Sequence, residues 1–169
     1  MKIVRTDITK LQVDAIVNAA NTSLLGGGGV DGAIHDAVGP ELLVECLKLG
    51  GCETGDVKVT SGHKLPAKYI FHAVGPIWRS GTRGEAEQLS SCYSRSMQIG
   101  NELGINSIAF PAISCGAFRY PLDQAAEIAV SIIGSMLGNS SIKTVIFAVI
   151  DADVADAYEA ALRKRNAVT

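Results

Sequence analysis

The stretch Asn18–His35, NAANTSLLGGGGVDGAIH, decides the fold because four consecutive glycines in it join a predicted strand to a predicted helix. Val13–Val17 (VDAIV), just before it, is a short and mostly apolar run typical of a buried strand. Val30–Val38 (VDGAIHDAV) has helical spacing after an acidic residue that suits a helix start. The pattern is therefore strand, glycine loop and helix.

The glycine loop, Gly26–Gly29, has the chemistry of an anion site. Glycines can adopt positive φ and bring bare backbone N–H groups close to a ligand. The helix start adds partial positive charge, which favours a phosphate. A flexible surface loop is the alternative. The amides of Asn18 and Asn21, which we expect just after the buried strand, favour a binding site, because buried polar side chains need partners.

Two common nucleotide motifs are excluded at this loop. No Gly-Lys-Ser/Thr sequence follows the glycines, so the lysine and hydroxyl of a nucleoside triphosphate site are missing. The glycines follow the strand by too many residues for the dinucleotide fingerprint, and their spacing does not match it.

A second connection of the same kind lies later in the chain. A predicted strand at Ser107–Pro111 runs through AISCGAFRY to a helix that Pro121 opens. Ser114 and Gly116 could offer backbone donors to the other side of a diphosphate, although an ordinary strand-to-helix turn would look similar.

The composition indicates a globular protein. The 169 residues suffice for one domain, which we expect to span 1–169. With 47% hydrophobic and 19% charged residues, and no long apolar run, we expect no membrane segment. Met1–Lys10 lacks the apolar core of a signal peptide, so we expect a cytoplasmic protein. The net charge of −2 makes nucleic acid an unlikely partner.

Metal binding is not expected. The four cysteines form no C-x-x-C pair, and the three histidines are equally scattered, so reduced thiols are the simpler interpretation. Asp151, Asp153 and Asp156 suit the first turn of a helix better than a magnesium site.

Strand-like and helix-like runs alternate along the chain, which predicts an α/β fold: a mixed six-stranded sheet with helices on both faces. The expected strands are Lys2–Arg5, Ala15–Val17, Val57–Ser61, Tyr69–Val74, Ser107–Pro111 and Lys143–Ile150. The expected helices are Val30–Val38, Glu41–Leu49, Glu85–Leu103, Leu122–Leu137 and Asp153–Arg165.

Four motifs resemble the macrodomains, and specifically their MacroD-type branch: VNAAN, GGGGVDGAIH, HAVGPIW and FPAIS, in the order of the family and with its spacing. The resemblance covers nearly the whole chain, from Thr6 to Asp151. It implies a three-layer α/β/α sandwich that binds ADP-ribose. Such domains often hydrolyse ADP-ribose from acidic side chains without a metal or other cofactor.

The resemblance also implies roles for particular residues. Asp7 would accept a hydrogen bond from the adenine amine, with capping of a turn as the alternative, and the Ile8 N–H would contact the same ring. Many relatives carry an aromatic residue near Ile150. The remaining implied ligand contacts are Asn18, Gly28, Gly29, Val30, Ser114, Cys115, Gly116, Ala117 and Phe118.

For catalysis, the resemblance implies that Asp31 orients or deprotonates a water and that Asn21 holds a ribose hydroxyl. Gly116 would leave room for that water, and His35 would orient it unless it is only a packed helix residue. The expected substrates are mono-ADP-ribosyl esters of Asp or Glu on proteins and O-acetyl-ADP-ribose.

The second loop departs from the family pattern at Cys115 and Arg119, and Arg119 would either reshape this loop or place a cation beside the phosphates. A non-catalytic reader of ADP-ribose is therefore the alternative function.

Overall fold

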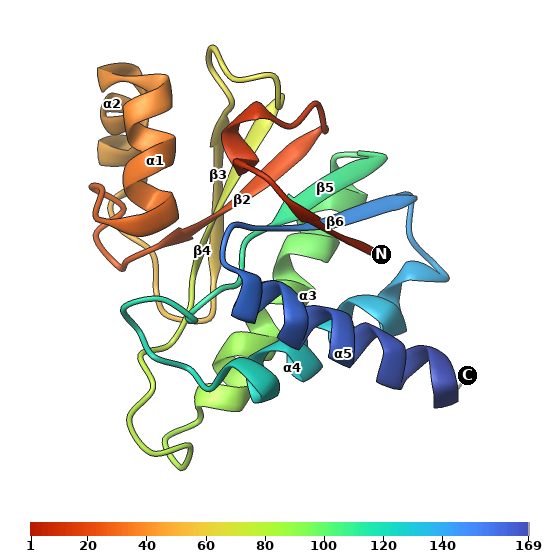
Figure 1. The fold of residues 1–169 in the computed structure, drawn as a ribbon. Helices are drawn as coiled ribbons and strands as arrows, with labels where there is room; N and C mark the ends of the chain where they lie inside the picture. Colours follow the sequence, from red (N-terminus) through yellow and green to blue (C-terminus); the bar gives the residue numbers. More distant parts are fainter. Residues whose placement is uncertain (169) are drawn as a thin grey trace.

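A single sheet organises the residues that the computed structural model describes, 1–168. Its strand order is β1-β6-β5-β2-β4-β3 (Figure 1). Every neighbouring pair is parallel except β3 and β4, which confirms the predicted mixed sheet. The strands are β1 (Lys2–Arg5), β2 (Ala15–Ala20), β3 (Val57–Ser61), β4 (Tyr69–Val74), β5 (Ser107–Phe110) and β6 (Thr144–Val149).

Helices cover both faces of this sheet, so the expected three-layer α/β/α arrangement is confirmed. In Figure 1, α1 and α2 lie on one side, and α3, α4 and α5 lie on the other. The helices are α1 (Gly29–Val38), α2 (Pro40–Leu49), α3 (Glu85–Glu102), α4 (Leu122–Leu137) and α5 (Ala152–Val168), with a short 3₁₀ helix, η1 (Ile8–Lys10).

Each face of the sheet packs its own apolar core. On β2, Ile16 and Ala20 belong to the core beneath α1 and α2, whereas Ala15 and Val17 belong to the core beneath α3, α4 and α5. A strand that is buried on both faces needs apolar residues at nearly every position. A polar residue in such a strand therefore needs a polar partner inside the protein.

Asn18 is such a residue, and its expected place was wrong. It does not follow the strand but lies inside β2, directly opposite His72 of β4. Both side chains are fully buried. The local pattern missed this because the groups that accept from Asn18 Nδ2, Asp31 Oδ1 and His72 Nδ1, come from a helix and from a different strand, while Asn18 Oδ1 is buried without a partner.

The described residues contain no helix that is both long and apolar enough to span a membrane.

Candidate functional site

The carboxyl ends of the five parallel strands meet at one edge of the sheet, and a cavity of about 570 Å³ opens there. This size is typical of small-molecule sites, and this edge is where open α/β sheets bind ligands. The segments after all five strands line it, including Thr6–Ile8 after β1, Gly27–Asp31 after β2, Gly75 after β4, Pro111–Phe118 after β5 and Ile150 after β6.

The glycine loop delivers the start of α1 to the cavity. Gly26 and Gly29 have φ of 97° and 57°, values that glycine adopts without strain. Gly28, Gly29 and Val30 line the cavity, and the backbone N–H groups of Gly29 and Val30 have no partner among residues 1–168. Unpaired N–H groups at a helix start favour an anion, so the anion site that the sequence predicted stays a prediction that this geometry suits.

The second loop forms the facing wall. Its left-handed residue Ser114, with φ of 66°, turns the chain so that the Tyr120 N–H donates to the Ser114 carbonyl at 2.9 Å. The N–H groups of Gly116, Ala117 and Phe118 have no partner in the described chain, and all three residues line the cavity. Ser114 Oγ is buried there without a hydrogen-bond partner. The two loops therefore present donors to a common space.

Asp31 is the buried carboxylate of this cavity, and it lies in the first turn of α1, where negative charge is favoured. Its Oδ1 accepts a hydrogen bond of 2.8 Å from Asn18 Nδ2, and His35 Nε2 lies 3.4 Å from the same oxygen. Its other oxygen faces Gly27: a Cβ built on this glycine would lie 3.1 Å from Asp31 Oδ2 and 3.5 Å from Asn21 Nδ2. The carboxylate and the Asn21 amide therefore converge at Gly27.

Asn21 holds its own loop together. Its Oδ1 accepts from Ser23 N, Ser23 Oγ and Leu24 N at 3.1, 2.6 and 3.2 Å, and its Nδ2 donates to the Gly26 carbonyl at 2.9 Å. An amide nitrogen carries two hydrogens, so one donor of Nδ2 is left for a ligand.

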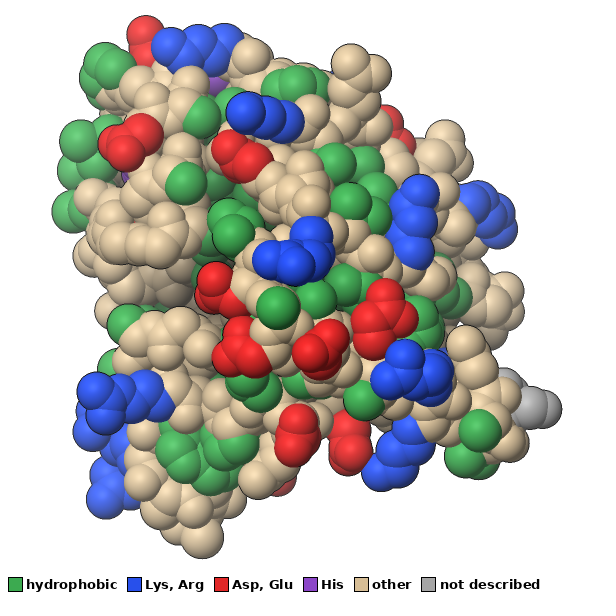
Figure 2. Space-filling model, in the orientation of Figure 1, with side chains coloured by type: hydrophobic (Ala, Val, Ile, Leu, Met, Phe, Trp, Pro, Cys, Tyr) green, Lys and Arg blue, Asp and Glu red, His purple; other side chains and the backbone are tan. Residues whose placement is uncertain are grey.

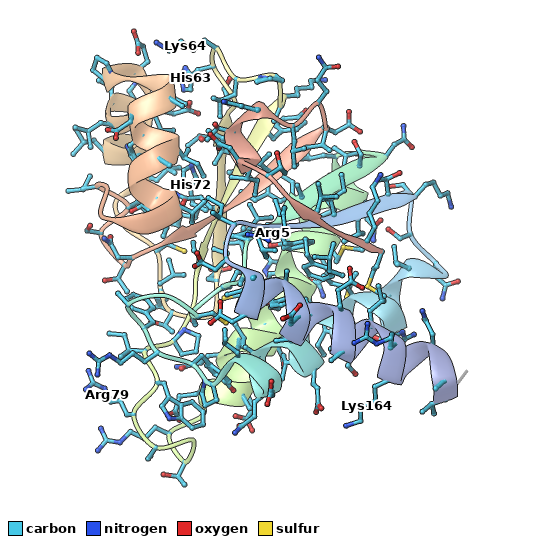
Figure 3. The ribbon with its side chains drawn as sticks, viewed as in Figure 1. Arg5, His63, Lys64, His72, Arg79 and Lys164 are labelled. Atoms are coloured by element: carbon cyan, nitrogen blue, oxygen red, sulfur yellow. The ribbon has the colours of Figure 1, made fainter. Side chains whose placement is uncertain are left out.

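Behind Asp31, a chain of buried polar groups fixes the Asn18 amide. Asn18 Nδ2 lies 3.1 Å from His72 Nδ1, and His72 Nε2 lies 2.9 Å from Thr60 Oγ1. Since Asn18 Nδ2 can only donate, His72 Nδ1 accepts and Nε2 carries the proton. Burial lowers the pKa of His72 to about 4, so the ring is neutral. Figure 3 shows His72 between α1 and the strands.

Asp7 caps a turn, which is one of the two roles that the sequence left open, and its contact with adenine stays a prediction. Its Oδ1 accepts from Thr9 N at 2.9 Å and from Thr9 Oγ1 at 2.7 Å, which caps η1 and lowers the pKa of Asp7. Its Oδ2 makes no hydrogen bond within residues 1–168, and Asp7 lines the cavity beside the buried Ile8.

Ile150, which is 69% exposed, lines the cavity next to the segment after β1, because it follows β6, the strand that pairs with β1. Arg5 holds this residue, because its Nε and one terminal nitrogen donate to the Ile150 carbonyl at 3.1 and 2.9 Å. The Ile150 side chain therefore stays available to a ligand in the cavity.

The four cysteines form no disulfide within residues 1–168. Within residues 1–168, no group of three or more His, Cys, Asp or Glu residues could hold a metal ion. Cys115 lines the cavity, but burial raises the pKa of its thiol to about 12, so it stays protonated.

The structure thus brings together most of the predicted site residues, but Asn18 and His35 are not on the cavity wall. Both contact Asp31 from behind. Sequence reasoning placed Gly27 in the anion loop without naming it as a ligand contact, and it named no contact at Gly75, although both line the cavity. A Cβ at Gly75 would overlap the Ser114 side chain, which explains this glycine. The position of Gly75 directly after the predicted strand Tyr69–Val74 was the available signal.

An α/β/α sandwich whose two strand–loop–helix connections close on one cavity is the architecture of a macrodomain. The chain belongs to the macro domain family, whose model matches residues 17–129, and within it to the MacroD-type branch.

Relatives are similar over most of this chain. A macro domain-containing protein of Mesorhizobium japonicum is 56% identical over 162 residues, which cover 94% of this chain and 92% of the relative. A Xenopus laevis protein named ADP-ribose glycohydrolase MACROD2 is 55% identical over 85% of this chain, but the match spans only 35% of that protein.

Among solved structures, the Oceanobacillus iheyensis macrodomain with ADP has a TM-score of 0.94 and 40% identity, covering 99% of this chain and 92% of that one. The Trypanosoma brucei macrodomain in complex with ADP-ribose has a TM-score of 0.87 and 41% identity, covering 94% and 67% respectively.

Proposed function

We propose that this protein binds ADP-ribose in the cavity of about 570 Å³. It hydrolyses esters that join the distal ribose of ADP-ribose to Asp or Glu side chains or to acetate. The convergence of the Asp31 carboxylate and the Asn21 amide on Gly27 carries the proposal. The complexes with ADP and ADP-ribose formed by similar macrodomains, and the name of the Xenopus relative, support it.

The polar groups of the cavity fit the parts of ADP-ribose. The unpaired N–H groups of the two loops suit the diphosphate, and Asp7 Oδ2 is an acceptor for the adenine amine. Phe118 packs beside the distal ribose in this proposal, and Asn21 Nδ2 donates to a ribose hydroxyl.

Hydrolysis needs one water beside Asp31. The water oxygen bonds either to the anomeric carbon or to the acyl carbon, the ester C–O bond at that carbon breaks, and ADP-ribose and a carboxylic acid leave. Asp31 orients the water or accepts its proton. Asn18 and His35 position the carboxylate, and Gly116 leaves space on the facing wall. Rate enhancement comes mainly from positioning, since a carboxylate is a good leaving group.

The test compares the parent protein with Asp31→Ala on a protein mono-ADP-ribosylated at glutamate and on O-acetyl-ADP-ribose. We expect the variant to lose turnover by at least a hundredfold, in the range of a general base. Asp36→Ala is the matched control, because Asp36 lies on the same helix but is exposed and outside the cavity. A folded Asp31→Ala variant that releases ADP-ribose at the parental rate would falsify the catalytic role.

A second candidate function is a reader that binds ADP-ribose without turnover. The observation that favours it is the Asn21 side chain, whose oxygen is wholly committed to its own loop. Calorimetry with ADP-ribose, run beside the release assay, separates the two functions, because a reader binds tightly and releases nothing.

A further inference from the structure

A second cavity of about 410 Å³ adjoins the first, and Asn21, Gly75 and Phe118 line both. The shared wall therefore includes Asn21, the residue that the proposed function places at the distal ribose. A group attached to that ribose would leave the first cavity toward the second.

The side chains of the second cavity carry positive charge. Arg79 and Arg83 line it from the loop between β4 and α3, and both are exposed. Their guanidinium groups have no hydrogen-bond or ion-pair partner within residues 1–168. Figure 3 places Arg79 on this loop, and Figure 2 shows Lys and Arg side chains in the same region of the surface.

The acidic residue of this cavity, Glu85, does not neutralise the arginine side chains. Its Oε2 accepts from the backbone N–H groups of Arg79, Ser80 and Gly81 at 3.1, 3.1 and 2.8 Å, and its Oε1 accepts from Arg83 N at 2.6 Å. These bonds lower the pKa of Glu85 to about 2, so it stays a carboxylate that holds the loop.

The loop is also tied to the ADP-ribose side. Trp78 N–H donates to the Phe118 carbonyl at 2.8 Å, and the Trp78 ring lies 4.7 Å from the Tyr120 ring between centroids. The segment that contains Arg79 and Arg83 is therefore fixed to the second loop through Phe118 and Tyr120.

We infer that the second cavity binds the acidic polypeptide segment that flanks the ADP-ribosylated residue of a target protein. This inference rests on the proposed function. The unpaired guanidinium groups of Arg79 and Arg83, on a loop fixed by hydrogen bonds, attract carboxylates. Asp or Glu side chains beside the modified residue of the target would lie within reach of them. Thr54 and Gln88 add polar groups for the peptide backbone.

The test uses two synthetic peptides that carry ADP-ribose on a central glutamate through a non-hydrolysable amide linkage. The acidic peptide has two further glutamates on each side, and the neutral peptide has glutamines there. Affinities of the protein for both peptides and for free ADP-ribose are measured by calorimetry at 50 mM salt. We expect the acidic peptide to bind about fivefold more tightly, as for two exposed ion pairs. High salt should remove this preference.

Arg79→Gln combined with Arg83→Gln should reduce the ratio of the two affinities to near one. Lys48→Gln combined with Arg163→Gln is the matched control, since it removes the same charge from exposed sites outside both cavities and should keep the ratio.

Equal affinity of the parent for both peptides, with ADP-ribose still bound, would overturn this inference and leave the proposed function standing. Failure to bind ADP-ribose would overturn the proposed function and the inference together. Displacement of the acidic peptide by a single-stranded oligonucleotide, lost in the double arginine variant, would show a nucleic-acid surface instead and also overturn the inference.

Discussion

Asp31 is held in place by residues that do not reach the cavity. Asn18 donates to its carboxylate, and His72 and Thr60 determine which way the Asn18 amide points. A buried network of this kind is favourable when its hydrogen bonds are complete, and it is expensive when one partner changes its protonation state. The weak point of the network is His72.

Protonation of His72 should destabilise the fold in mild acid. Burial lowers its pKa from 6.5 to about 4, so the unfolded chain takes up this proton more readily than the folded protein. Stability from the neutral ring is complete above pH 6.5 and is lost as the pH falls toward 4, by about 3 kcal/mol at that pH. Urea unfolding between pH 4 and 7.5 measures this loss.

His72→Gln removes the titrating group while keeping an acceptor for Asn18 and a donor for Thr60. We expect this variant to be less stable at pH 7.5 but to show a flatter dependence on pH over the same range. An equally steep curve in His72→Gln would assign the acid sensitivity to other groups.

At the scale of elements, the start of α1 is limited by the glycine loop that precedes it. A Cβ at Gly32 would lie 2.6 Å from the Gly27 carbonyl oxygen, closer than real Cβ contacts. Gly27 in turn lines the cavity, and a Cβ on it would approach the side chains of Asp31 and Asn21. A larger residue at Gly32 of α1 would therefore also displace the glycine loop at Gly27.

Gly32→Ala should destabilise the protein, although alanine normally favours a helix by about 1 kcal/mol. The backbone contact should outweigh that gain, for a net loss of about 1–3 kcal/mol, as for other overpacked sites. Gly138→Ala is the control, because a Cβ there meets no atom within 4 Å and φ is −60°. Thermal unfolding of both variants measures whether each one is stabilised or destabilised. A Gly32→Ala variant that is more stable than the parent would contradict the predicted clash with the Gly27 carbonyl.

The elements were largely predictable from local patterns. The bounds of β1, β3 and β4 agree with the predicted runs, because a turn-forming segment follows each run: Thr6-Asp7, Gly62 and Gly75. β2 was predicted too short, because Asn18 is satisfied across the sheet by His72.

Some residues of the site could be predicted from local sequence, and others needed the order of the strands in the sheet. The first loop could be recognised locally, since Gly26 and Gly29 adopt positive φ, whereas the left-handed residues of the second loop, Ser114 and Arg119, are not glycines. Gly75 and the second cavity could not be recognised locally, because both depend on β2 lying beside β4. The paired residues of these two strands lie about fifty positions apart in the chain. The individual ligand contacts stay predictions.

At the scale of the whole molecule, the two cores lie on opposite faces of one sheet. The sheet is common to both, so loss of packing on either face weakens strands that the other face needs. We therefore expect the protein to unfold in a single transition.

Leu42→Ala should lower the free energy of unfolding by about 2–5 kcal/mol, because Leu42 of α2 is fully buried beneath the sheet face that also carries Asn18. Leu47→Ala, on the same helix but 58% exposed, should change it by less than about 0.5 kcal/mol. Urea unfolding followed by fluorescence and by circular dichroism checks both values. Separate transitions for the two probes would contradict a shared sheet.

The pairing of β1 with β6 has a consequence for synthesis on the ribosome. Lys2–Arg5 is made long before its neighbour in the sheet, Thr144–Val149. At 5–20 residues per second, β1 waits on the order of ten seconds with its edge unpaired. The cavity also takes Asp7 from the early segment and Ile150 from the late one. A nascent chain therefore acquires its ligand site only after β6 and Ile150 have been made.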